Sequence, residues 1–146
     1  MRQELLQQYI YNETLLSRLY RQVATKAPSS KERDAYLQFA AEASANAEKL
    51  NQIYRDEYGT GFNPIVPDTV LQGGYRELVV ELLDVELTSM TELRKHTYFQ
   101  QDFRINETFR QIADGKFDNI VILLSILENY NNIQIQELKR MMEEYN

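Results

Sequence analysis

The sequence predicts an all-α fold: a four-helix bundle with one long crossover between the second and third helices, followed by a short C-terminal helix. Apolar residues recur at alternating three- and four-residue steps in four segments. The chain has only 5 Gly and 3 Pro, and they are clustered, which favours long helices with few breaks. Two helices on each side of one long connection is the layout of a bundle with a single crossover.

The first pair of helices is joined by a short loop. The first apolar stripe covers residues 6–23 and stops at "KAPSSKE", where a proline ends the helix. Ser29 and Glu32 have the spacing of a capping box for the second helix. Its stripe covers residues 36–54, and Gly59 supplies a C-terminal stop.

The long connection is the stretch 59–74, which holds four of the five glycines and two of the three prolines. It is interpreted as a connection inside one domain, residues 1–146, because neither half alone would bury enough apolar surface.

The second pair of helices has stripes at residues 79–93 and 105–130, with a break around residues 99–103. Asp102 is a candidate N-cap for the fourth helix. Two asparagines at 131 and 132 weaken the helix there, so "IQIQELKRMMEEY" is predicted as a short fifth helix or a bent continuation.

Composition excludes several function classes. A net charge of −6 argues against a nucleic-acid or anionic-membrane binder, because both need a basic surface. The chain has no cysteine, which excludes disulfides, thiolate metal sites and cysteine nucleophiles. No signal peptide and no bilayer-spanning run is apparent, so a cytoplasmic protein is expected.

Each apolar stripe is interrupted near its middle by a polar or small residue. A single glutamate on a stripe can reach solvent through its long side chain. Four interruptions at matched depth favour one internal polar layer, because bundles align the middles of their helices. Lys116 is the only cation of the layer, and buried charges are rare unless paired. The layer residues are Glu13, Ala43, Asn46, Glu86, Lys116 and Asn119.

The pattern resembles the rubrerythrin-like branch of the ferritin-like superfamily. The resemblance covers about residues 3 to 130 as pattern, not identity. Glu13 and Tyr20 in "ETLLSRLY" match the family's Glu and Tyr seven residues apart, and Glu86 in "LLDVELTSM" matches a second Glu helix, with Glu81 and Asp84 as near alternatives. The resemblance implies a bundle that binds two irons through carboxylates and imidazoles.

The sequence departs from the family at the iron ligands. In "FAAEASANAEKL", Ala43 stands at the family's Glu position and Asn46 at its His position. In "FRQIADGKFDNI", Lys116 stands at the Glu position and Asn119 at the His position.

A one-residue shift of both helices would bring Glu42 and Asp118 to these positions. Such a shift rotates a side chain by about 100°, off the apolar stripe, so the unshifted register is kept.

The leading hypothesis is a non-enzymatic relative that has lost its di-iron site and serves a structural or interaction role. Lys116 then supplies positive charge where the metal would lie, between Glu13 and Glu86, and no catalytic, cofactor-binding or metal-binding residue is expected. Gly115 beside it is expected to allow close packing of another helix. The family that the chain resembles includes members tied to stress and spore formation, so the resemblance implies such a setting.

The alternative is a ferritin-like protein with a reduced site and ferroxidase- or peroxidase-type activity. Glu13, Glu86 and either Asp84 or Asp118 would then bind iron or another divalent metal.

Self-association is also expected, most simply as a two-fold homodimer. Its basis is the apolar character of "IQIQELKRMMEEY", together with the resemblance. The sequence indicates no specific protein partner.

Overall fold

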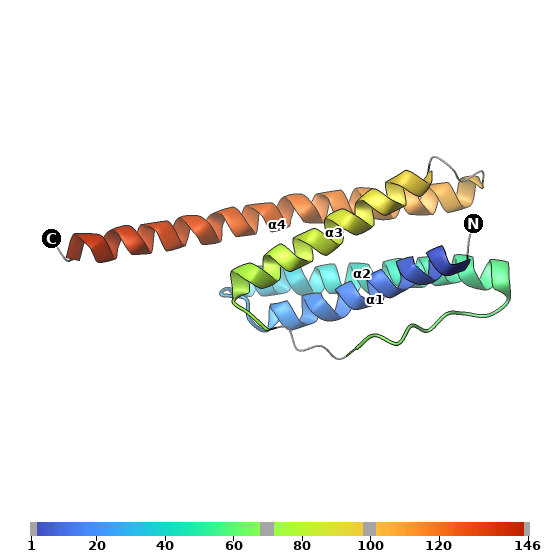
Figure 1. Ribbon diagram of the computed structural model, residues 1–146, viewed down its shortest axis with the longest axis horizontal. Coiled ribbons are helices and arrows are strands. Elements are labelled where there is room, and N and C mark those ends of the chain that lie inside the picture. Colours follow the sequence, from blue (N-terminus) through green and yellow to red (C-terminus); the bar gives the residue numbers. More distant parts are fainter. Residues whose placement is uncertain (1–2, 68–71, 98–101, 145–146) are drawn as a thin grey trace.

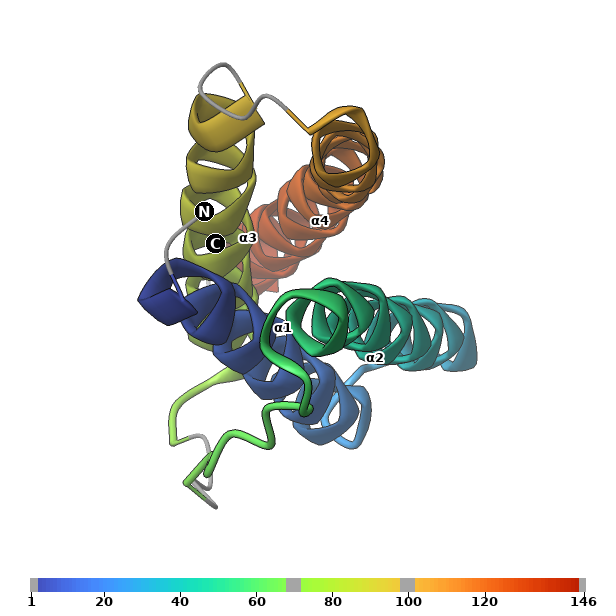
Figure 2. The ribbon, with the colours of Figure 1, turned by 90° about the vertical axis from the view of Figure 1, so that its right-hand side faces the viewer.

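The computed structural model describes residues 3–67, 72–97 and 102–144, which form an all-helical fold. The helices are α1 (Gln3–Ala24), α2 (Ser30–Tyr58), α3 (Tyr75–Thr97) and α4 (Phe103–Glu144). α1 packs mainly on α2, and α3 mainly on α4, so the bundle has two layers (Figure 2). The prediction of an all-α fold built on four helices is confirmed.

The ends of α2 follow the predicted capping chemistry. The Ser29 hydroxyl accepts a hydrogen bond from the backbone N–H of Glu32 at 3.2 Å. At the other end, Gly59 has a φ of 79° and its N–H donates to the carbonyl of Arg55. This left-handed conformation is one that glycine adopts without steric cost.

α4 begins at the predicted N-cap. The Asp102 carboxylate accepts hydrogen bonds from the backbone N–H groups of Arg104, at 2.9 Å, and Ile105, at 3.2 Å. Of the break predicted around residues 99–103, residues 98–101 lie outside the described part of the chain.

The prediction of a separate short C-terminal helix is wrong. α4 continues for 42 residues to Glu144 and projects beyond the other three helices (Figure 1). Asn131 and Asn132 do not end it, because asparagine costs only a few tenths of a kcal/mol against alanine and neither Gly nor Pro follows. In residues 3–67, 72–97 and 102–144, no helix combines the length and hydrophobicity needed to span a membrane.

The described residues that follow α2 lie outside the bundle (Figure 1). Residues 60–67 run beside α1, where the Arg18 guanidinium donates to the carbonyl of Val66 at 2.6 Å (Figure 1). Residues 68–71 of the predicted connection lie outside the described residues.

The hydrophobic core consists of two clusters, one toward each end of the bundle. One cluster gathers around Tyr20, Tyr36 and Leu82. The other gathers around Tyr9, Leu50 and Phe109. Residues 13, 86 and 116 are buried and belong to neither cluster, so a layer of charged side chains separates the two apolar clusters.

Gly115 does not contact another helix, contrary to the expectation of close packing. The residue is exposed, and a Cβ atom added to it would meet no atom within 4 Å. The next residue, Lys116, is buried, and one step along a helix turns a position by about 100°, which brings Gly115 to the solvent side.

Replacing Gly115 with alanine is expected to raise the free energy of unfolding by about 1 kcal/mol, because glycine is that much less favourable than alanine inside a helix. Chemical denaturation measures the change. Gly59→Ala is the matched control and should destabilise, because its φ of 79° strains a residue with a Cβ. Destabilisation by Gly115→Ala would contradict the open surroundings described above.

Candidate functional site

The candidate site is the polar layer in the middle of the bundle. α1 contributes Glu13, α3 contributes Glu86 and α4 contributes Lys116, and these side chains are 1%, 2% and 2% exposed. α2 contributes buried Ala43 and half-buried Asn46. The structure therefore brings together side chains that the sequence placed on four separate stripes.

Lys116 forms the centre of the layer. Its Nζ lies 2.6 Å from Glu13 Oε1 and 2.8 Å from Glu86 Oε1, and it donates a hydrogen bond to Glu86. The ion pairs expected from the sequence are therefore present. Burial alone lowers the pKa of Lys116, but the two adjacent carboxylates outweigh it and raise that pKa, so the amine stays charged.

Glu86 is held from two sides. Its Oε1 accepts from Lys116, and its Oε2 accepts from the Tyr20 hydroxyl at 2.9 Å. Burial and the charge of Glu86 both raise the pKa of Tyr20, so the phenol remains a donor throughout the physiological range. Tyr20, which the sequence placed near the layer, is thus a direct partner of one carboxylate.

Glu13 is bound less completely. Neither of its carboxylate oxygens accepts a hydrogen bond of regular geometry from the described residues, although Lys116 lies within ion-pair distance. Burial raises the pKa of Glu13, Lys116 lowers it in part, Glu86 raises it again, and Asn46 gives only a small lowering. Burial outweighs the effect of Lys116, so the net effect is to raise the pKa of Glu13 above its ordinary value.

Glu42 is a site residue that the sequence argument excluded when it set aside the shifted register. It lines the site, and its Oε2 accepts a hydrogen bond from the Asn119 side chain at 3.0 Å. Asn119 therefore links α4 to α2. The unshifted register is correct for Ala43, which is buried, yet a glutamate one position away is long enough to reach the edge of the layer.

The other acidic candidates and the single histidine lie elsewhere. Asp84 and Asp118 are exposed and do not line the site. His96, in the last turn of α3, lies beside Glu92 and the ring of Tyr9. Among the described residues, no three His, Asp or Glu side chains are placed to hold a metal ion.

Little space remains inside the layer. The cavity bounded by Glu13, Ala43, Glu86 and Lys116 has a volume of about 10 Å³. A cavity needs about 10–15 Å³ to hold one water molecule. The site is thus large enough for at most about one water, and the ammonium group lies between the two carboxylates.

Comparison with known proteins identifies the fold alone. No protein-family model and no curated protein matches the chain. A solved structure of a hypothetical protein from Pyrococcus furiosus is similar, with a TM-score of 0.77 and 16% sequence identity, over 88% of this chain and 89% of that one. At this identity the similarity extends to the fold and not to an activity.

Replacing Lys116 with methionine is expected to cost about 3–5 kcal/mol in the free energy of unfolding, because it removes the cation from buried carboxylates. Adding Glu13→Gln and Glu86→Gln to this variant should recover much of the loss, since the charge is removed as well. Denaturant unfolding of the single and triple variants measures both effects. A triple variant no more stable than the single one would contradict the electrostatic account.

The stability difference between Glu13→Gln and the wild type is expected to depend on pH. A folded-state pKa above the ordinary 4.5 means that the unfolded chain loses the Glu13 proton first. Wild-type stability therefore falls as pH rises from 4.5 through the folded-state pKa, whereas glutamine does not titrate. In parallel unfolding titrations, the free energy of unfolding of the variant should rise relative to that of the wild type over this pH window. The opposite slope would show that Lys116 holds Glu13 ionised.

Proposed function

We propose that the chain is a ferritin-like protein of the rubrerythrin-like branch in which a lysine-centred ion cluster has replaced the di-iron site. It serves a structural or interaction role and not a catalytic one. The observation that carries this proposal is the position of the Lys116 ammonium, 2.6 Å from Glu13 and 2.8 Å from Glu86.

The arrangement of the helices supports the ferritin-like part of the proposal. In Figure 1, α2 and α3 run in the same direction, although each is antiparallel to its own neighbour. Two consecutive parallel helices need a connection about as long as the bundle. A single long crossover between the two helix pairs is typical of ferritin-like folds.

The chemistry of the layer supports the loss of iron. Iron sites are built from carboxylate and imidazole ligands, and here the layer contains carboxylates and amides beside an ammonium. A divalent cation would have to displace Lys116 from both glutamates and take its place in a closed interior. The ammonium also makes a cation unnecessary, because it already compensates the carboxylate charge.

A reduced metal site is the weaker proposal. It needs Asp84 or Asp118 to join Glu13 and Glu86, and both aspartates are exposed and outside the layer. Glu42 is nearer, but its carboxylate is engaged by Asn119. The geometry therefore favours the metal-free function over ferroxidase or peroxidase chemistry.

The purified protein is expected to bind less than one equivalent of ferrous iron tightly, because Lys116 occupies the position between the two ligands that remain. Anaerobic titration followed by desalting and elemental analysis measures the bound metal. Two tightly bound irons per chain, with the absorbance of an oxo-bridged pair after oxidation, would refute the proposal.

A variant with the family's ligands restored is the positive control. It combines four substitutions: Ala43→Glu, Asn46→His, Lys116→Glu and Asn119→His. This variant should gain iron binding while the wild type does not. A folded variant, verified by circular dichroism, that still binds no iron would show that the proposed correspondence of positions is wrong.

A further inference from the structure

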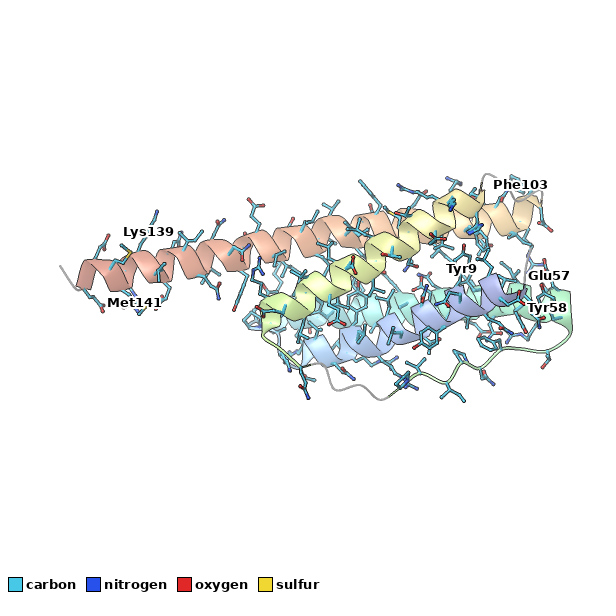
Figure 3. The ribbon with its side chains drawn as sticks, viewed as in Figure 1. Tyr9, Glu57, Tyr58, Phe103, Lys139 and Met141 are labelled. Carbon is cyan, nitrogen blue, oxygen red and sulfur yellow. The ribbon has the colours of Figure 1, made fainter. Side chains whose placement is uncertain are left out.

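The last part of α4 is an uncovered amphipathic helix. We call residues 132–144 the α4 projection; all of them are exposed, and at 1.5 Å per residue they extend about 20 Å. Figure 3 shows Lys139 and Met141 on this part of the helix, away from α1, α2 and α3. Most of the exposed large hydrophobic residues in the described part of the chain lie on α4, and five lie on the projection. They are Ile133, Ile135, Leu138, Met141 and Met142, each between 46% and 63% exposed.

A groove lies between the α4 projection and the start of α3. It has a volume of about 640 Å³, and its lining includes Arg76, Asn131, Ile135, Leu138 and Met141. Arg76 marks its inner end, where the guanidinium donates to the Asn131 side chain at 3.1 Å. An isolated helix this short is marginally stable in water, and apolar surface of this kind marks an interaction site.

We propose that the α4 projection of a second copy fills this groove, in an antiparallel two-fold dimer. The projection itself forms one wall of the groove. Two projections packed side by side in opposite directions therefore fill each other's grooves, and this mutual exchange gives a closed, self-complementary interface. The inference does not depend on the ion cluster inside the bundle.

The spacing of the groove residues fits a helix of the same kind. Three residues of the groove, Asn131, Ile135 and Leu138, and then Met142 one turn further on follow one another at steps of four, three and four residues. Steps of this kind form the seam of a coiled coil.

The one carboxylate that lines the groove is paired within its own helix. Glu137 lines the groove, and Arg140 pairs with both Glu137 and Glu144. At 100° per residue, Arg140 and Glu144 lie nearly opposite the seam defined by Ile135 and Leu138. Two chains that each carry a net charge of −6 can thus bring their seams together while the groove carboxylate keeps its own cation.

The antiparallel direction follows from Arg76. In this direction the carboxyl end of each projection, which is the negative end of its helix dipole, approaches Arg76 of the other copy. A parallel pairing would place two bundles of charge −6 at the same end and would leave Arg76 without this complement.

The first test compares two matched variants of the full chain by sedimentation equilibrium. The wild type is expected to be a dimer at micromolar concentration. Leu138→Glu places a carboxylate in the seam of both copies and should weaken dimerisation at least tenfold. Ile133→Glu is the control, because Ile133 is just as exposed but faces away from the seam, and it should leave the dimer intact. A wild-type monomer, or equal effects of the two variants, would overturn the proposal.

The second test determines the direction. The chain has no cysteine, so single cysteine substitutions report only on their own positions. Asn131→Cys and Met142→Cys chains, mixed and mildly oxidised, should form mixed disulfides and few self-disulfides. Self-disulfides of Met142→Cys alone would show a parallel pairing. Absence of any disulfide in this mixture, and also in a mixture of Ile135→Cys and Leu138→Cys chains, would show that the projections do not meet.

Discussion

The contact of one buried ammonium with two buried carboxylates is the interaction on which the rest of this structure depends. Removing three charged groups from water costs several kcal/mol for each ion, and only close pairing compensates that cost. Lys116 pairs with Glu13 of α1 and Glu86 of α3 from its position on α4. A single side chain therefore connects three of the four helices.

The fourth helix joins this arrangement through a different contact. α2 places an alanine against the layer, and it reaches α4 at the edge through the hydrogen bond of Glu42 with Asn119. A sliding movement of any helix would leave a charged or amide group in one of the two apolar clusters. The layer therefore adds specificity of register to a bundle whose apolar stripes alone would tolerate several registers.

Much of this fold follows from local sequence chemistry. Helix ends can be predicted from single capping residues: Ser29, Gly59 and Asp102. The apolar stripes place Lys116 between two glutamates. The burial of Glu42 and the exposure of Gly115 could not be predicted from the apolar stripes. Glu42 is half-buried one position away from the stripe, and the solvent side of Gly115 depends on which helix passes nearby. The sequence did not predict the full length of α4, because the last part of this helix buries no apolar face against the rest of the chain.

The unpredicted length of α4 sets the interior of the bundle apart from its surface. α4 contacts the start of α3 through residues 130 and 131. Beyond them the helix continues with an apolar seam, and Arg140 pairs there with Glu137 and Glu144. The interior, in contrast, has little free space, with a cavity of about 10 Å³ beside the ion cluster. On these two proposals together, the layer around Lys116 holds the helices in register, and the α4 projection makes the contact with a second copy.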